Sequence, residues 1–248
     1  MFPWIHGWVD TERTPQTNTR LGLVLAFVAG ATNAGGFLAV HEYTSHVTGV
    51  VSTVVDSLVL GHTDVMLTGL AMLISFVLGA MTTAILVNWG LRRKLYTAYG
   101  LPLVLEAALL LVFGVFGGAM NYATYFFAPL TVTLLCFIMG LQNAVITKIS
   151  RAEIRTTHLT GLVTDVGIEL GKMVYINHAD THSPVRANTQ KLRLHSLLIG
   201  SFVTGAFLGA WGFKTLGFIT TVPLALTLLL LVARPLWQDT THWVQRKH

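Results

Sequence analysis

The sequence carries one pattern in two copies, GATNAGGFLAVHEYTSHVTGVVSTVVDSLVLG at residues 30–61 and GLQNAVITKISRAEIRTTHLTGLVTDVGIELG at residues 140–171. Each copy begins with a glycine and an Asn-Ala pair, continues with the motif T-x-H-x-T-G, and ends in a short apolar stretch that holds acidic residues. Because these features recur in the same order, we interpret the two copies as an internal repeat.

The similarity between the copies extends beyond this pattern. The Asn-Ala pairs lie 110 residues apart and the T-x-H-x-T-G motifs 112 residues apart, so the second copy contains two inserted residues. Further along, FVLGA at 76–80 resembles FVTGA at 202–206. We therefore divide the chain into two related repeats, at about 21–118 and 123–233.

The composition around the repeats is typical of a membrane protein. Only 11% of the residues are charged and 53% are apolar, whereas about 25% of the residues of a soluble domain are charged. A membrane-spanning helix needs about 20 mostly apolar residues. We predict an all-helical integral membrane protein with about six transmembrane helices, at 21–40, 64–89, 100–118, 123–147, 195–213 and 217–233.

Two further apolar stretches, 47–60 and 159–171, are shorter than a spanning helix. They also contain acidic side chains, which are costly in contact with lipid. We interpret both stretches as half-helices or re-entrant segments that enter the membrane without crossing it.

Basic residues predict which loops face the cytoplasm, because short cytoplasmic loops are enriched in Lys and Arg. The basic residues before the first span, between later spans and after the last one all fall on one side when only the six long runs cross. They are Arg13, Arg20, Arg92, Arg93, Lys94, Lys148, Arg151, Arg155, Arg234, Arg246 and Lys247. Lys214 is the exception, and the loops 41–46 and 118–122 on the other side contain no Lys or Arg.

This topology makes residues 1–20 a cytoplasmic N-terminal segment, residues 21–233 a single transmembrane domain and residues 234–248 a cytoplasmic tail. Each repeat then contains three spans and one half-segment. Because three is odd, the second repeat enters the membrane from the opposite side, and the repeats have inverted topology. Treating both short stretches as full spans would instead place a basic loop outside.

Inverted repeats are a recurring plan of secondary transporters, whose sites lie where interrupted helices meet. We therefore expect a secondary transporter or facilitator of a small molecule or ion, with proton coupling as one option. A channel lined by the two half-helices is one alternative, and a duplicated scaffold without transport is another. A membrane-embedded enzyme or a haem or metal protein that uses paired histidines is a third.

Polar residues at the repeat motifs are the candidates for substrate binding. An unpaired amide is costly in an apolar helix, so the two repeat asparagines should face the protein interior. Their amides either contact substrate or hold the adjacent half-segment. With the residues that open the half-segments, the predicted substrate-binding set is Asn33, Asn143, Thr48, Thr160, Gly49 and Gly161.

Titratable residues form a second set, with gating or proton relay as the predicted role. It contains His46, His158, Asp56, Asp165, Glu169 and Glu106. Structural capping of the half-segments by the histidines and neighbouring threonines is an alternative, and Lys172 offers Glu169 a plain structural pair. One histidine per repeat lacks further ligands at tight spacing, so we expect no metal and no cofactor.

Other classes of function find little support in the sequence. We find no G-x-S-x-G, H-E-x-x-H or Walker motif, and we do not expect an enzyme. The single cysteine, Cys136, has no partner in the chain. The net charge of +5 resides in loops, so topology explains it better than a nucleic-acid partner does. The lipid bilayer and the solute are the expected partners, and a homo-oligomer is compatible with the sequence.

The motifs G-x-x-N-A and T-x-H-x-T-G and the stretch LQNA at 141–144 resemble the YoaK family of bacterial multipass membrane proteins. The resemblance covers about residues 20–233. It implies a protein of the bacterial inner membrane, with both termini cytoplasmic in our topology. It implies no substrate, cofactor or catalytic residue, because the family is largely uncharacterised.

Overall fold

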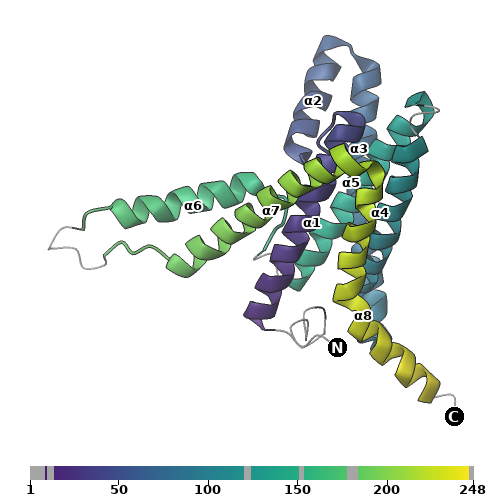
Figure 1. The fold of residues 1–248 in the computed structure, drawn as a ribbon. Coiled ribbons are helices and arrows are strands. Elements are labelled where there is room, and N and C mark those ends of the chain that lie inside the picture. The colour runs from purple at the N-terminus through teal and green to yellow at the C-terminus, as the bar shows by residue number, and fades with distance from the viewer. Residues whose placement is uncertain (1–8, 10–13, 120–123, 151–153, 178–183, 246–248) are drawn as a thin grey trace.

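The computed structural model describes residues 9, 14–119, 124–150, 154–177 and 184–245. These residues form helices and contain no strand (Figure 1). The helices are α1 (Pro15–Val40), α2 (Val47–Leu60), α3 (Thr63–Arg92), α4 (Leu101–Ala119), α5 (Thr124–Ile149), α6 (Leu159–Val174), α7 (Thr189–Leu216), the 3-10 turn η2 (Gly217–Thr220) and α8 (Thr221–Gln245). Of the residues used to predict the topology, Arg13, Arg151, Arg246, Lys247 and positions 120–122 lie outside the described ranges.

Five helical segments are long and apolar enough to cross a membrane. They are Pro15–Val40, Thr63–Arg92, Leu101–Gly118, Phe127–Ile149 and Thr189–Thr241. The last segment contains α7, η2 and α8, and the chain reverses direction at η2 (Figure 1). The apolar helices indicate a membrane protein in contact with lipid, as the composition predicts.

The two short stretches form helices that are too short to span a bilayer. α2 has 14 residues and occupies the predicted range, and α6 has 16 residues and ends three residues later than predicted. Three long helices extend well beyond their predicted ranges: α1 begins at Pro15 rather than at 21, within the predicted N-terminal segment. α7 begins at Thr189 rather than at 195, and α8 continues to Gln245, through most of the predicted tail.

The core is built on two helix crossings that contain glycines. α7 crosses α1 at Gly30 and Gly205, and α3 crosses α5 at Gly79 and Gly140. A Cβ atom at any of these glycines would lie 2.0–2.1 Å from a carbonyl oxygen of the facing helix, so only glycine permits this approach. Small residues allow such close packing between apolar helices. The facing oxygens belong to Phe202, Phe27, Phe137 and Phe76, respectively.

α1 and α5 have the same pattern of burial. From 21 to 36 and from 131 to 146, each position has the same degree of burial as the position 110 residues away. This spacing is that of the Asn-Ala pairs. The first helix of each repeat therefore occupies an equivalent environment, packed against the second long helix of the chain's other half.

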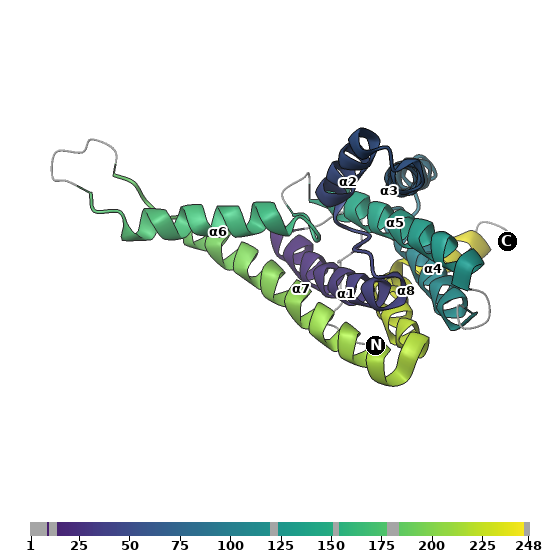
Figure 2. The ribbon, with the colours of Figure 1, turned by 90° about the horizontal axis from the view of Figure 1, so that it is seen from above.

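The short helices lie at the edges of the bundle. α6 and the first part of α7 form a hairpin that projects to one side, and α2 and the first part of α3 form a hairpin at the top (Figure 1). Seen from above, α2 and α6 remain apart (Figure 2).

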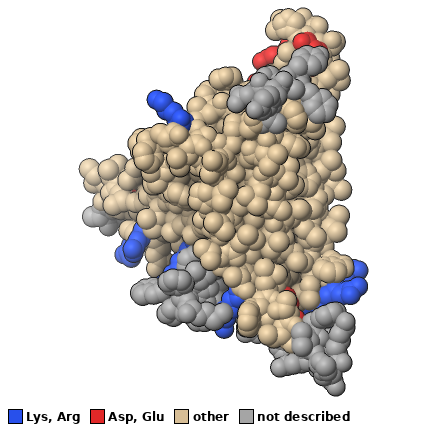
Figure 3. Space-filling view, turned by 45° about the vertical axis from the view of Figure 1, so that its right-hand side comes forward, with Lys and Arg blue, Asp and Glu red and all other residues tan. Residues whose placement is uncertain are grey.

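Charged side chains are distributed unevenly along the long axis. On the face that Figure 3 shows, most Lys and Arg side chains lie in the lower half, and most of the visible Asp and Glu atoms lie at the top. α1 begins and α8 ends at the lower end of the bundle (Figure 1).

Candidate functional site

The asparagine of each repeat binds the linker that precedes the short helix. The hydroxyl of Ser45 donates a hydrogen bond of 2.9 Å to Asn33 Oδ1, and the hydroxyl of Thr157 donates one of 2.8 Å to Asn143 Oδ1. Ser45 and Thr157 occupy the same position of the repeat motif. The amides therefore hold linker hydroxyls, rather than the free backbone ends of the half-helices.

The histidine of each motif precedes the first helical residue of α2 or α6. Neither His46 nor His158 makes a side-chain capping hydrogen bond. A Cβ atom at Gly49 would lie 2.6 Å from Nδ1 of His46, and one at Gly161 would lie 2.5 Å from Nδ1 of His158. The glycine of T-x-H-x-T-G thus makes room for the imidazole, which explains the spacing of the motif.

The threonines of the motif do not form the caps that we considered. Thr44 and Thr156 are buried, and no described residue forms a hydrogen bond with either side-chain hydroxyl. Thr48 and Thr160 lie in the first turns of α2 and α6 and are exposed. Their hydroxyls are therefore accessible from outside the bundle.

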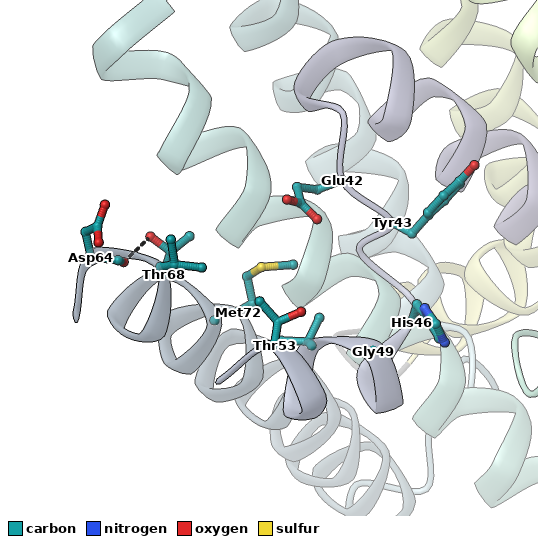
Figure 4. Close-up of a pocket in the computed structure, with 11 residues that line it drawn as sticks. Glu42, Tyr43, His46, Gly49, Thr53, Asp64, Thr68 and Met72 are labelled. Atoms are coloured by element: carbon teal, nitrogen blue, oxygen red, sulfur yellow. Dashed lines mark hydrogen bonds between the residues drawn. The ribbon is translucent and has the colours of Figure 1, made fainter. Parts of the chain in front are cut away.

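A first cleft of about 370 Å³ lies between the 41–46 linker, α2 and α3 (Figure 4). Glu42 lies above Thr53 and Met72, while His46 and Asp64 mark its two ends. The Thr68 hydroxyl donates a hydrogen bond of 2.9 Å to the backbone carbonyl of Asp64. Exposed carboxylates make this cleft acidic.

A second cleft, of about 940 Å³, lies between α1, α6 and α7. Its charged and titratable lining residues are Arg20, Asp165, Lys191, Arg193 and His195. Cations therefore predominate here.

The two clefts occupy equivalent places in the repeats. At the 126-residue spacing of FVLGA and FVTGA, Gly69 corresponds to His195 and Val65 corresponds to Lys191, and all four residues line a cleft. At the 112-residue spacing, Thr53 corresponds to Asp165. At these three positions the first cleft has uncharged residues and the second has titratable ones.

Asp165 connects α6 to the beginning of α7. Lys191 Nζ lies 3.2 Å from Asp165 Oδ1, and His195 Nδ1 lies 3.5 Å from Asp165 Oδ2. His195 is 5% exposed. Neither Lys191 nor His195 could be predicted as a partner of Asp165, because spacing along one helix cannot reveal a partner that follows a loop.

Glu169 forms a second connection between these helices. Lys172 Nζ lies 2.8 Å from Glu169 Oε1, so the structural pair that was the alternative to a relay role is present. The N–H of Asn188 donates a hydrogen bond of 2.6 Å to Oε2. The Lys172 ammonium and the Asn188 N–H lower the pKa of the Glu169 carboxyl, because both favour its charged form.

Two other predicted relay residues lie away from the clefts. Asp56 is exposed on α2 and does not line either cleft. Glu106 on α4 is fully buried, and neither carboxyl oxygen has a hydrogen-bond partner among the described residues. No group of three or more His, Cys, Asp or Glu side chains that could hold a metal ion occurs within the described ranges.

Helical architecture and apolar surfaces place the chain among membrane proteins of all-helical type. Residues 21–233 match the family described as protein of unknown function DUF1275, and the chain belongs to this family. No curated protein and no solved structure matches the chain. The expectation of an uncharacterised family is confirmed over nearly the expected residues, and the narrower resemblance to YoaK stays a prediction.

Proposed function

We propose that the protein is a secondary transporter or facilitator that moves a small solute across the bacterial inner membrane, and that its two repeats have inverted topology. The observation that carries the proposal is the recurrence of the same contacts in both repeats. Asn33 binds Ser45 as Asn143 binds Thr157, and the glycine crossing of α1 with α7 recurs between α5 and α3. Paired, interrupted elements of this kind are characteristic of transporters.

The distribution of charge supports the proposed orientation. If α7 and α8 cross separately, the described helices provide six crossings, and α2 and α6 lie at opposite membrane faces. α1 then begins and α8 ends at the same face as the basic ends of α3 and α5 (Figure 1). Short loops rich in Lys and Arg favour the cytoplasm at this face.

In this topology each cleft opens to a different side of the membrane. The acidic cleft beside α2 faces outward, and the basic cleft beside α6 faces the cytoplasm. Alternating access would connect each cleft in turn to a site near the two repeat asparagines. A solute would compete there with Ser45 and Thr157 for the amides of Asn33 and Asn143.

The titratable residues supply routes for proton coupling. His46 lines the outward cleft, whereas His158 stands at the start of α6. Asp165 and Glu169 join α6 to α7, so a change in their charge would alter how the hairpin is held. Buried Glu106 is the remaining candidate, because an unpaired charge is costly at its position.

Sided labelling of single cysteines tests the inverted topology. Tyr43 and Arg155 occupy equivalent positions, and both are exposed. We would place one cysteine at either position in a Cys136→Ser background and treat intact cells with a membrane-impermeant thiol reagent. We expect position 43 to react from outside, and position 155 to react only after the membrane is opened. Labelling of both positions from the same side would refute inverted repeats.

Flux in proteoliposomes then distinguishes the kinds of transport. A panel of small anions, cations and polar molecules would be tested with and without an imposed proton gradient. Uphill movement driven by protons would identify a coupled transporter, whereas strictly downhill flux would identify a facilitator or a channel. If no member of a broad panel moved, the duplicated scaffold would be the better description.

A further inference from the structure

The cytoplasmic cleft between α1, α6 and α7 contains more positive than negative charge. Arg20 from α1 and Lys191 and Arg193 from α7 line it, against the single carboxylate of Asp165. Asp165 is already paired with Lys191 at 3.2 Å. Neither arginine has an ion-pair partner among the described residues. Two exposed arginines therefore line a cleft whose one carboxylate is already paired.

Two helix N-termini also open into this cleft. α1 starts at Pro15 behind Thr14, and α7 starts at Thr189 behind Asn188. Gln16 and Gln190, each the second residue of its helix, both line the cleft. An N–H group at this position has no acceptor within its own helix. Converging N-termini present these N–H groups and a partial positive charge, which together favour an anion.

One buried polar atom at the same place has no hydrogen-bond partner in the part of the chain that the structure describes. His195 is 95% buried and lines the cleft, and its Nδ1 has no hydrogen-bond partner among the described residues. Asp165 Oδ2, at 3.5 Å, lies beyond normal hydrogen-bond distance. A buried polar nitrogen costs free energy unless a hydrogen-bond partner satisfies it.

The fold does not require these charges. The first repeat builds the equivalent cleft with Gly69 at the position of His195 and with Val65 at the position of Lys191. The positive charge of the second cleft is therefore a property of that cleft alone.

We propose that the cleft between α1, α6 and α7 binds a small oxyanion, either a phosphate or a carboxylate. Arg20 and Arg193 would pair with its oxygens, because a planar guanidinium matches two oxygens at once. The N–H groups of Gln16 and Gln190 would donate to the same anion. Its source is a soluble cytoplasmic anion or the phosphate of an anionic lipid.

Equilibrium binding to purified protein in a neutral detergent tests this inference. The probes would be inorganic phosphate, sulfate and acetate, and separately a short-chain phosphatidylglycerol, each followed by calorimetry. We expect saturable binding of at least one probe, weakened about tenfold or more in both Arg20→Gln and Arg193→Gln. Lys214→Gln is the matched control, because Lys214 is an exposed cation in the last turn of α7.

The two kinds of probe identify the source of the anion. Binding of soluble phosphate or acetate, lost in the arginine variants, would support a solute site. Binding of the lipid alone, lost in the same variants, would support a headgroup site of the same chemistry. Absence of saturable binding, or equal weakening by Lys214→Gln, would overturn the inference. Unliganded melting temperatures would first establish that each variant is folded.

Anion binding is independent of the transport proposal. The calorimetric measurement uses no gradient and no membrane, so its failure would leave the sided-labelling and flux results unaffected. Conversely, anion binding at this cleft is also expected if the protein is a channel, or a scaffold that transports nothing.

Discussion

Replacement of Gly205 by alanine should push α7 away from α1. A Cβ atom at this position would lie 2.0 Å from the carbonyl oxygen of Phe27 and 2.7 Å from its carbonyl carbon. Ordinary contact begins at about 3.4 Å, so the two backbones must separate by more than about 1 Å. Gly200 offers the matched control, because a Cβ atom there meets nothing within 4 Å on the same helix.

The expected destabilisation follows from comparing these two variants. Alanine improves helix propensity by about 1 kcal/mol in both, so this gain cancels in the difference. Overpacking of a well-packed contact typically costs about 1–3 kcal/mol. We therefore expect Gly205→Ala to be less stable than Gly200→Ala by about this amount. For a chain of this length, each kcal/mol corresponds to about 2–4 °C in melting temperature.

The buried thiol of Cys136 provides the assay. Cys136 is 1% exposed and is the sole cysteine of the chain. A fluorogenic maleimide should therefore react mainly as the purified protein unfolds on heating in detergent. Gly205→Ala should melt about 2–12 °C below Gly200→Ala. Equal melting temperatures would show that the two helices do not approach as closely as described, and would refute the reasoning about the crossing.

Three further outcomes are expected in the same melting assay. Asp239→Ala should lower the free energy of unfolding by about 1–3 kcal/mol, because the Asp239 carboxylate accepts hydrogen bonds from the N–H groups of Tyr96 and Thr97 at 2.8 and 2.9 Å. A loss of less than about 0.5 kcal/mol, as for an exposed substitution, would contradict this role. Glu106→Gln should keep the melting temperature of the wild type. Glu106→Lys should lower it severely, because the long cation would be buried without a partner. Equal melting temperatures of the two variants would argue that Glu106 does not lie in apolar surroundings. At pH values above the ordinary pKa of a glutamate, Glu169→Gln should be less stable than the wild type. The difference in stability should vanish as the pH falls through the lowered pKa of Glu169, because protonation removes the same charge from the wild type. A difference that does not depend on pH would exclude the charge as its cause.

The long helices could be predicted because length and hydropathy are local properties of the sequence. The boundaries of α2 followed from the length of its apolar stretch, and spacing within one helix offered Lys172 as an alternative partner of Glu169. Periodicity could not predict which helices pack together. Nothing local indicates that Gly30 meets Phe202, because the two residues come from opposite ends of the chain.

The candidate site was predicted less completely, for the same reason. The repeat drew attention to Gly49 as a substrate contact, but its place against His46 gives a steric explanation for the motif. Partners that follow loops, such as Lys191 and His195 for Asp165, could not be read from spacing. Asp239 belonged to a predicted tail, yet it binds the backbone between α3 and α4.

The packing of helices from one half against helices of the other half has a consequence for biosynthesis. The glycine face of α1 has its partner on α7, which is translated only after most of the chain has been made. Until then, α1 must wait in the bilayer with this face covered by lipid or by an insertion factor. α3 and α5 are close neighbours in the sequence and can pair much earlier. Assembly should therefore begin at the α3–α5 crossing and close at the α1–α7 crossing, so a chain truncated before α7 would have an unclosed core.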